Sequence, residues 1–314
     1  DLAGPTSGYR RKARLGVRNV PAKGGVLVGF RERGSSPVAD VAACRVLAPE
    51  VGAILAPLRR VVAGLSVAHA VPQLEIAVGD DGAIIVLRHL EPLSDADEAL
   101  LRDAGARLGF HPWLQSGGPA TVRPLDADAP QRLHYTLPAF GLRLAFHPLD
   151  FTQVNVDVNR MMVDAAVELL APTPGDRVLD LFCGLGNFTL PLATRCEEVH
   201  GVEGSEALVA GARENAEANG IESARFEVAD LYAPEFSPAS LPQADLVLLD
   251  PPRSGAERIC AEMAALAPRR IVYVSCNPET LARDAALLQG AGYAMSAAGI
   301  VDMFPNTAHM ESMA

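Results

Sequence analysis

Residues 177–187 read Arg177-Val-Leu-Asp-Leu-Phe-Cys-Gly-Leu-Gly-Asn187, and this stretch decides the fold. An apolar run with one internal acid ends in two glycines, and a helical pattern follows at 187–194. Glycine lets the backbone pass close beneath a ligand, and the following helix presents free N–H groups at the turn. The stretch therefore predicts a strand, a tight turn and a helix, with a ligand site at the turn.

The sequence beyond residue 151 continues this alternation. Apolar runs typical of strands lie at 198–203, 225–230, 245–250, 270–276 and 294–304. Helical patterns lie at 156–170, 205–219, 255–267 and 278–289. Continuous Val, Leu and Ile runs separated by helices indicate parallel strands that are covered on both faces. We therefore expect a doubly wound, Rossmann-like α/β domain at 149–314, with ligands beyond the carboxyl ends of its strands.

The first half of the chain has a different pattern of apolar and charged residues. Alternating apolar and charged residues predict strands at 9–18, 26–33, 74–78, 83–88, 134–137 and 142–146. Turn residues at 23–25 and 79–82 predict hairpins between the first two pairs. Helical patterns at 48–65 and 94–108 interrupt the strands, and Ser94 is placed as an N-cap. We expect residues 1–148 to form a β-rich α+β domain.

Length and composition exclude several classes of protein. The 314 residues are 49% hydrophobic and 21% charged, which is ordinary globular composition with room for two cores. No apolar run approaches the about 20 residues of a membrane helix, and we see no leader pattern. The five cysteines form no Cys-x-x-Cys pair, which argues against a disulfide framework and a zinc ribbon. A soluble, cytoplasmic protein without membrane contact or obligate protein partner is expected.

Charge is distributed unevenly along the chain. The formal net charge is −11, but the first 33 residues hold eight basic and two acidic side chains, a net charge of +6. We call these basic residues the basic strip: Arg10, Arg11, Lys12, Arg14, Arg18, Lys23, Arg31 and Arg33. Such a strip on an acidic body is compatible with local binding of a phosphate backbone, and equally with a solvated strand face.

Acidic residues follow the strand ends around the glycine turn. A dinucleotide-binding fingerprint would need a third glycine where this chain has Thr189. Asp180 precedes the turn, and Glu203 ends the next predicted strand, where a carboxylate can hold both hydroxyls of a ribose. Asp230 ends the third predicted strand and is placed to face an adenine. The pattern favours S-adenosylmethionine over a dinucleotide.

Cys276 lies where a reactive thiol would be expected. It ends the fifth predicted strand of the second half, directly before a helix. A helix N-terminus lowers the pKa of a thiol, and a thiolate beside a methyl donor suggests attack on an electron-poor ring. Arg253 follows Asp250-Pro-Pro, a place where amino-group methyltransferases carry an aromatic residue. An amine-directed reaction is therefore disfavoured.

Three segments of the second half carry a family resemblance. They are Asp250-Pro-Pro-Arg-Ser-Gly255, Ile271-Val-Tyr-Val-Ser-Cys-Asn-Pro-Glu-Thr280 and Val301-Asp-Met-Phe-Pro-Asn-Thr-Ala-His-Met-Glu311. They resemble the two signatures of the RNA uracil-5-methyltransferase family, with Asn306 as a departure where His, Gln or Tyr is usual. Segments at 9–14, 28–35 and 44–49 are most similar to the 23S ribosomal RNA branch of that family, and the similarity covers nearly the whole chain.

The resemblance implies a role for individual residues. It implies a nucleophile at Cys276 and a general base at Glu311. His309 is two residues from Glu311, so on a strand it would share its face, and we expect it to be structural rather than catalytic. It implies cofactor contacts from Gln153, Phe182, Asn187, Glu203, Asp230 and Asp250. The implied chemistry agrees with these residue types, because a thiolate that adds to C6 of uracil makes C5 nucleophilic, and a carboxylate can then remove the C5 proton.

The resemblance also implies a metal ligand. In the ribosomal RNA branch a cysteine at the place of Cys44 is the last of four ligands of a [4Fe–4S] cluster. The other three ligands, with a small RNA-binding barrel, belong to a segment ahead of residue 1, so we expect no assembled cluster from this chain alone. We also expect residues 311–314 to lead into a final strand.

The sequence thus predicts an S-adenosylmethionine-dependent enzyme that makes 5-methyluridine in 23S ribosomal RNA. Two alternatives remain at this point. A tRNA uridine methyltransferase is disfavoured by Cys44 and the segment at 28–35. A non-catalytic RNA-binding factor on a methyltransferase shell is disfavoured by the presence of both Cys276 and Glu311.

Overall fold

The protein was analysed as a computed structural model that describes residues 1–20, 25–31 and 38–314. The chain divides into two compact units. The C-terminal unit contains Asp1–Gly4, Thr136–Leu144 and Asp157–Ala314, and the N-terminal unit contains Pro5–Tyr135 and Ala145–Val156. Lys23 and Arg33 of the basic strip, and part of the segment at 28–35, lie outside the described residues. No helix of the described chain is long and apolar enough to cross a membrane.

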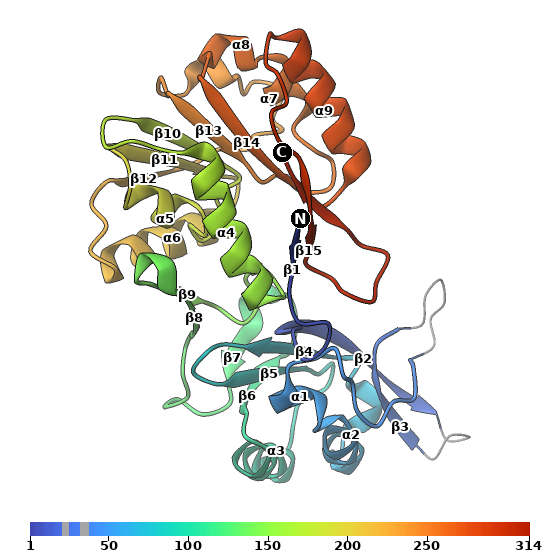
Figure 1. The fold of residues 1–314 in the computed structure, drawn as a ribbon. Coiled ribbons are helices and arrows are strands. Elements are labelled where there is room, and N and C mark those ends of the chain that lie inside the picture. The colour runs from blue at the N-terminus through green and yellow to red at the C-terminus, as the bar shows by residue number, and fades with distance from the viewer. Residues whose placement is uncertain (21–24, 32–37) are drawn as a thin grey trace. The chain divides into compact units, whose positions relative to one another are not determined.

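One sheet organises the C-terminal unit (Figure 1). Among the described residues its strand order is β1-β15-β16-β14-β13-β10-β11-β12. The strands β10 to β14 run parallel, β16 runs antiparallel to β14 and β15, and β1 runs parallel to β15. The bounds are β1 (Leu2–Ala3), β10 (Arg177–Leu181), β11 (Glu198–Glu203), β12 (Ala224–Val228), β13 (Leu246–Leu249), β14 (Arg270–Ser275), β15 (Gly299–Asp302) and β16 (Glu311–Met313).

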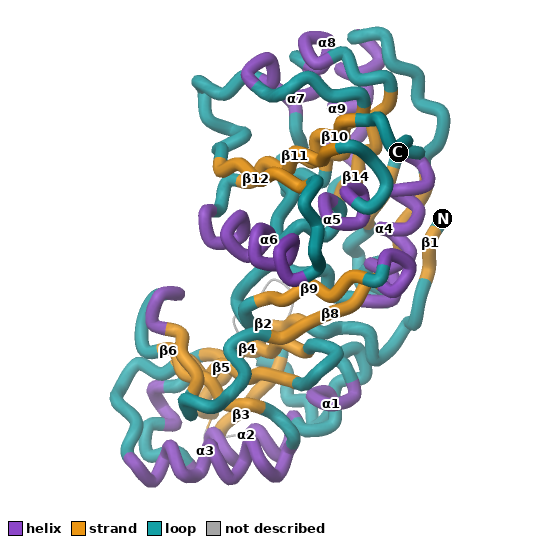
Figure 2. The backbone as a smooth tube through the Cα atoms, turned by 90° about the vertical axis from the view of Figure 1, so that its left-hand side faces the viewer, coloured by secondary structure: helices purple, strands orange, loops and turns teal. Residues whose placement is uncertain are grey.

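Helices cover both faces of this sheet. Their bounds are α4 (Val156–Leu170), α5 (Thr189–Ala193), α6 (Glu206–Ala218), α7 (Glu257–Ala261), α8 (Met263–Leu266) and α9 (Pro278–Gly290), with a 3₁₀ turn at Pro238–Ser240. Leu179, Leu249 and Tyr273 form a buried cluster with side chains of α7, α8 and α9. The helices α5 and α6 contact β11 and β12, and Figure 2 shows α6 beside these strands. The expected doubly wound α/β architecture is therefore confirmed.

Local signals explain where these elements begin and end. The side chains of Ser205 and Asn277 accept backbone N–H groups at the starts of α6 and α9, as N-caps do. The helix expected at 255–267 is instead two short helices, because the backbone leaves the helical hydrogen-bond pattern at Glu262. Residues 311–313, expected only to lead into a final strand, are themselves the strand β16. The pairing of β1 with β15 was not expected.

A second sheet organises the N-terminal unit. Its described strands lie in the order β3-β2-β4-β5-β6-β7, antiparallel except for the parallel pair β5 and β6. The bounds are β2 (Lys12–Val20), β3 (Gly25–Gly29), β4 (Gln73–Val78), β5 (Ala83–Arg88), β6 (His111–Gln115) and β7 (Val122–Pro124). A separate pair is formed by β8 (Leu133–Leu137) and β9 (Leu142–Phe146). The strands β6 and β7 had no counterpart in the sequence prediction.

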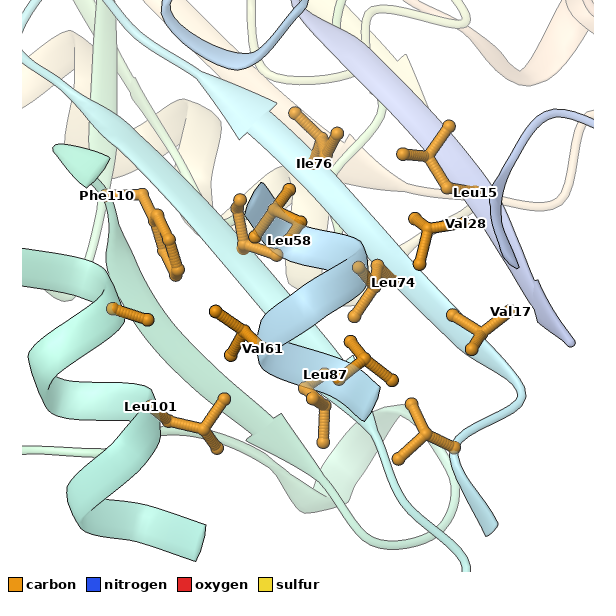
Figure 3. Close-up of a cluster of buried hydrophobic side chains, with 14 of the residues drawn as sticks. Leu15, Val17, Val28, Leu58, Val61, Leu74, Ile76, Leu87, Leu101 and Phe110 are labelled. Carbon is orange, nitrogen blue, oxygen red and sulfur yellow. The ribbon is translucent and has the colours of Figure 1, made fainter. Parts of the chain in front are cut away.

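Apolar side chains of helices pack against this second sheet. The helices are α1 (Pro49–Gly52), α2 (Leu55–Gly64) and α3 (Asp95–Leu108), with 3₁₀ turns at Ala68–Ala70 and Pro119–Thr121. A further 3₁₀ turn, Pro138–Phe140, belongs to the C-terminal unit. Figure 3 shows Leu58 and Val61 of α2 and Leu101 of α3 against the side chains of Leu74 and Leu87 from the sheet. Burying these apolar groups is the main force that holds the α+β layer together. Ser94 is the N-cap of α3 as expected, and Asp97 completes a capping box.

Candidate active site

Polar side chains gather at one edge of the C-terminal unit's sheet. Because β10 to β14 run parallel, their carboxyl ends share this edge, where ligands of such sheets bind. The strand β16 runs antiparallel to β14, so its first residue lies at the same edge. The expected site residues stand here as follows: Phe182 directly after β10, Asn187 in the turn before α5, Glu203 at the end of β11, Asp230 shortly after β12, Asp250 directly after β13, Cys276 directly after β14 and Glu311 at the start of β16.

Cys276 and Glu311 share one face of the sheet. Val274 of β14 pairs with Met313 of β16, and a step of two residues along each strand reaches Cys276 and Glu311. Side chains of a strand alternate between the two faces with a period of two. The thiol and the carboxyl group therefore lie on the same face, opposite each other across neighbouring strands.

Asp180 and Asp250 lie on that face as well. Asp180 pairs with Leu248, which is two residues before Asp250. Leu248 in turn pairs with Val272, which is two residues before Val274. The same alternation therefore aligns both aspartates with Cys276 and Glu311. Three carboxyl groups and one thiol face the same side of the sheet.

The buried Glu311 is suited to take up a proton near neutral pH. Its side chain is 5% exposed, and its Oε2 atom has no hydrogen-bond partner among the described residues. Burial raises the pKa of Glu311 to about 7, because a charged carboxylate is poorly solvated there. A carboxyl group with this pKa can act as a general base at the pH of the cell.

The thiol of Cys276 differs from the sequence prediction in its ionisation. Burial, and then the negative charge of Glu311, raise the pKa of Cys276, although the charge of Arg253 lowers it. The predicted fall in the pKa is therefore wrong for the protein without a ligand. The prediction considered only the start of α9, whereas the carboxyl groups come from distant parts of the sequence.

The two aspartates also have raised pKa values. Burial raises the pKa of Asp250 above its ordinary value, and the charges of Glu311 and Asp180 add to this effect. Asp180 is fully buried and accepts a hydrogen bond from Thr189 Oγ1 at 2.5 Å, while its Oδ1 has no partner among the described residues. Burial raises the pKa of Asp180 to about 7. Such a cluster of perturbed carboxyl groups is typical of functional sites.

The glycine turn is open on its ligand side. Phe182, Gly184 and Gly186 have positive φ angles of 69°, 54° and 88°, so the turn follows a path that favours glycine. A Cβ atom added at Gly184 would meet nothing within 4 Å. Glu203 approaches the turn from β11, where its Oε2 accepts from the Gly184 N–H at 3.3 Å and its Oε1 from the Ser205 N–H at 2.9 Å. The carboxylate of Glu203 is thereby held in one orientation.

A loop after β13 lies against the start of α9. Asn277 and Thr280 each donate a side-chain hydrogen bond to the carbonyl oxygen of Arg253, at 3.1 and 3.3 Å. The Arg253 guanidinium in turn contacts His309 Nδ1, and the imidazole packs edge-on against Phe304. His309 is exposed and precedes β16, so it is not the strand neighbour of Glu311 that the spacing suggested.

Gln153 belongs to the N-terminal unit, unlike the other expected cofactor contacts. It lies in a segment that Lys12 holds from within the same unit. Lys12 Nζ donates to the carbonyl oxygens of Pro148 and Asp150, the latter at 2.8 Å. Burial lowers the pKa of Lys12 to about 8. The lysine therefore supports the chain around Gln153 rather than standing free in solvent.

Other members of the basic strip also have partners within the N-terminal unit. Arg11 forms an ion pair with Asp80, and Arg14 forms one with Glu75 at 3.1 Å. Arg14 is largely exposed despite this pair. Together with the buried Lys12, these contacts assign part of the strip to the packing of its own unit. The strip is therefore not a uniform row of solvated cations.

Cys44 does not have the surroundings of a cluster ligand. It is half-buried in the N-terminal unit, and its backbone N–H donates to the Gly52 carbonyl oxygen at 3.0 Å. Within residues 1–20, 25–31 and 38–314, no three Cys, His, Asp or Glu side chains are grouped as metal ligands. A [4Fe–4S] cluster needs about four thiolates, so the described residues do not fit this group.

Sequence reasoning missed two residues that support the site. Asn159 of α4 is buried and forms a double hydrogen bond with Asn187. Tyr232 packs its ring 5.6 Å from that of Phe182, and its hydroxyl donates to the Gly255 carbonyl oxygen at 2.7 Å. A polar residue on the buried stripe of an amphipathic helix was the available signal for Asn159. Nothing in the local sequence marked Tyr232.

Comparison with known proteins adds independent information. A family model described as tRNA (Uracil-5-)-methyltransferase matches residues 141–314. A relative from Bordetella bronchiseptica, named 23S rRNA (uracil(1939)-C(5))-methyltransferase RlmD, is 53% identical over 320 residues that cover 100% of this chain and 69% of the relative. A relative of the same name from Alkalilimnicola ehrlichii is 55% identical, covering 100% of this chain and 71% of the relative.

A solved structure shows the same fold. It is the Pyrococcus abyssi tRNA (uracil-54, C5)-methyltransferase in complex with S-adenosyl-L-homocysteine, with a TM-score of 0.76 and 23% sequence identity. The match covers 99% of this chain and 76% of that chain. The fold and the acid-lined strand ends define an α/β protein of the methyltransferase class. Within this class, the chain belongs to the RNA uracil-5-methyltransferase family.

Proposed function

We propose that this protein transfers a methyl group from S-adenosylmethionine to C5 of a uridine in 23S ribosomal RNA. The observation that carries this proposal is the identity of 53–55% over the whole chain with relatives named for methylation of uracil 1939. The opposition of Cys276 and Glu311 across β14 and β16 supports it from the geometry. The target that these relatives' names give, uracil 1939 of 23S ribosomal RNA, is the target we propose for this protein.

Features at the strand ends and at the glycine turn support a site for S-adenosylmethionine in the C-terminal unit. The glycine turn offers open space above Gly184, and the fixed carboxylate of Glu203 suits the two hydroxyls of a ribose. Asp180 of β10, the strand that leads into this turn, keeps a buried oxygen with no hydrogen-bond partner among the described residues. When bound, the cofactor supplies an electrophilic methyl group. From the C-terminal unit, the residues proposed to hold it are Phe182, Asn187, Glu203, Asp230 and Asp250, and the family resemblance adds Gln153.

Cys276 and Glu311 act in sequence on the uracil ring. The Cys276 thiolate adds to C6, forming a carbon–sulfur bond and leaving an electron pair at C5 that becomes the nucleophile for methylation. Glu311 then accepts the proton from C5. The electrons of that C–H bond restore the C5–C6 double bond, and the sulfur leaves as thiolate. The uracil must leave its stack to reach this edge of the sheet.

The two units take different parts in this function. The C-terminal unit, with the strand ends and the glycine turn, binds the cofactor and carries the reacting side chains. The N-terminal unit contacts the RNA, and the exposed side chain of Arg14 is available for a phosphate despite its ion pair. By sequence, we assign residues 149–314 to the methyltransferase domain and residues 1–148 to the RNA-contacting domain. The compact units differ from these bounds at residues 1–4, 136–144 and 149–156.

A denaturing gel with cofactor labelled in its methyl group tests the mechanism. The Glu311→Gln variant keeps the size of the side chain but cannot accept the C5 proton, so it should accumulate a covalent protein–RNA adduct that carries label. The Cys276→Ala variant is the matched control and should form no adduct. Wild-type protein should release methylated RNA and form a stable adduct only with 5-fluorouridine RNA, whose fluorine cannot leave as a cation.

The outcomes separate the alternatives. Labelled 23S RNA with no labelled tRNA supports the ribosomal substrate, and the reverse result would replace it by tRNA. Turnover of Glu311→Gln at nearly the wild-type rate would show that another group is the base. No label in either RNA with wild-type protein would leave the non-catalytic RNA-binding role as the explanation.

A further inference from the structure

Asn159 and Asn187 form a closed pair of hydrogen bonds. Asn159 Nδ2 donates to Asn187 Oδ1 at 3.0 Å, and Asn187 Nδ2 donates to Asn159 Oδ1 at 2.9 Å. Asn159 comes from the first turn of α4 and is 3% exposed, whereas Asn187 comes from the glycine turn. Two carboxamides that each donate to and accept from the other have one relative orientation. The pair therefore fixes which way the Asn187 amide points.

The hydrogen bonds of the pair restrict which side chains can occupy position 159. Burying an amide costs free energy unless its polar atoms have partners, so this position is chosen for hydrogen bonding rather than for packing. The partner of Asn187 must offer a donor and an acceptor in one plane. Among side chains of this size, only asparagine and a protonated aspartic acid do so.

A second buried amide holds the same turn in a different way. Asn215 of α6 donates from Nδ2 to the backbone carbonyl oxygen of Leu185 at 3.3 Å. Asn215 thus supports the path of the turn, whereas Asn159 acts on a side chain of the turn. The two asparagines separate backbone support from side-chain orientation.

We propose that Asn159 is a positioning residue that orients the Asn187 amide toward S-adenosylmethionine. This inference rests on the proposed function, in which Asn187 contacts the cofactor. Without Asn159, the Asn187 amide loses these two hydrogen bonds, so its orientation is less tightly constrained. The bound cofactor then has to select one orientation among several, which weakens its binding. The RNA site, formed by other residues, is unaffected.

The first test separates cofactor binding from the other steps. Asn159→Ala should raise the Kd for S-adenosylmethionine in calorimetry by about tenfold, which corresponds to roughly 1.4 kcal/mol. The KM for the cofactor should rise similarly, while the KM for RNA and the kcat at saturating cofactor stay within a few fold. Asn215→Ala is the matched control for loss of a buried amide at this turn, and its effect on the Kd should be smaller. An equal effect of both variants would overturn the inference.

The second test uses Asn159→Asp and a pH series. A protonated carboxyl group at this buried position donates and accepts as the asparagine does, whereas the carboxylate cannot donate and repels Asn187 Oδ1. The ratio of the variant's Kd to the wild-type Kd should therefore approach one at low pH and rise with pH. Taking the ratio removes the titration of Asp180 and Glu311, which both proteins share. A ratio that does not change with pH would overturn the inference.

Failure of this inference is distinct from failure of the proposed function. If wild-type protein binds no S-adenosylmethionine, or methylates no uridine, the proposed function fails. If wild-type protein does both and the two Asn159 variants match it at every pH, only the positioning role fails. Should Asn159→Ala unfold, the pH series with Asn159→Asp decides alone, because that variant regains the native hydrogen-bond pattern at low pH.

Discussion

Two aspartates with little solvent exposure, one in each unit, have pKa values that are shifted in opposite directions. Asp97 at the start of α3 is 3% exposed, and Asp180 at the end of β10 is fully buried. Burial alone would raise the pKa of Asp97, but hydrogen bonds from the N–H and hydroxyl groups of Ser66 and Ser94 hold it well below its ordinary value. Asp180 has the hydroxyl of Thr189 and a pKa of about 7.

The difference shows that hydrogen bonds to a carboxylate can outweigh the effect of burial, which by itself raises the pKa. Asp97 is surrounded by donors and ties α3 to the preceding chain, so it serves the fold. Asp180 keeps an oxygen without a partner among the described residues, beside a turn that is open to a ligand. For these two aspartates, incomplete hydrogen bonding marks the residue of the candidate site, and complete hydrogen bonding marks the residue of the capping box.

The largest expected effect comes from the thiol at the strand end. Cys276→Ala should lower methyl transfer by about 10⁴-fold or more, because the route through covalent addition to C6 is lost. The free energy of unfolding and the Kd for S-adenosylmethionine should stay close to the wild-type values. Transfer assays, urea denaturation and calorimetry measure the three quantities. A parallel loss of cofactor binding would show that Cys276 lies on the cofactor side of the site.

Asp180→Asn should make the protein more stable at neutral pH. The folded-state pKa of about 7 lies above the ordinary value of 3.8, so the wild-type folded state binds more protons than the unfolded state between these values. Its free energy of unfolding then falls as pH rises, by about 1.4 kcal/mol per pH unit. The variant does not lose stability in this way. Its free energy of unfolding should therefore exceed that of wild type by about 4 kcal/mol at pH 7 and should equal it near pH 3.5. Urea denaturation measures the free energy of unfolding of both proteins across this pH range. If the two values changed with pH in parallel, the comparison would be contradicted.

Asp97→Ala should have the opposite effect on the free energy of unfolding at neutral pH. It removes the acceptor for four donors of Ser66 and Ser94, and should lower the free energy of unfolding by about 3 kcal/mol at pH 7. The pKa of Asp97 is lowered in the folded state, so the wild-type advantage is present above about pH 4 and fades as pH falls further. Methyl transfer by the folded variant should match wild type. A loss of activity without a loss of stability would assign Asp97 to the site.

The activity of wild-type protein should depend on the protonation of Glu311. With a pKa of about 7, this carboxyl group is increasingly protonated below pH 7 and cannot then accept the C5 proton. The rate at saturating substrates should fall about tenfold per pH unit on the acid side of 7. Single-turnover measurements between pH 5.5 and 8.5 check the slope. A flat profile would mean that proton removal is not limiting or that another group performs it.

The smallest expected effect concerns the basic strip. Arg14→Ala removes an exposed ion pair with Glu75, which contributes about 0.5 kcal/mol or less to stability. If Arg14 contacts a phosphate of the RNA, the variant should also show a shallower dependence of binding on salt, by about 0.7–0.9 in the log–log slope. Lys12→Met is a useful contrast, because Lys12 is held by carbonyl oxygens inside its unit. The Lys12→Met variant should have a lower free energy of unfolding, while the dependence of its RNA binding on salt should not change.

Local sequence patterns were sufficient for most of the C-terminal unit. The strand ending at Glu203 and the helix α4 have the predicted bounds, because continuous apolar runs, glycine turns and caps are local signals. They also placed Cys276 and Asp250 at strand ends. Features that depend on distant parts of the chain were not accessible: the raised pKa of Cys276 comes first from its burial and then from the charge of Glu311. The pairing of Asn159 with Asn187 likewise joins two elements that no local pattern connects.

The short strand β1 has a consequence for how the chain folds. Leu2 and Ala3 pair with Val301 and Asp302, so residues almost 300 positions apart close one border of the sheet. Contacts of such long sequence separation carry a large loop-closure entropy and form late. During synthesis, Leu2 and Ala3 must wait for residues almost 300 positions later before this border is complete. A chain stopped short of β15 would therefore leave β1 unpaired, even though the whole N-terminal unit had already been made.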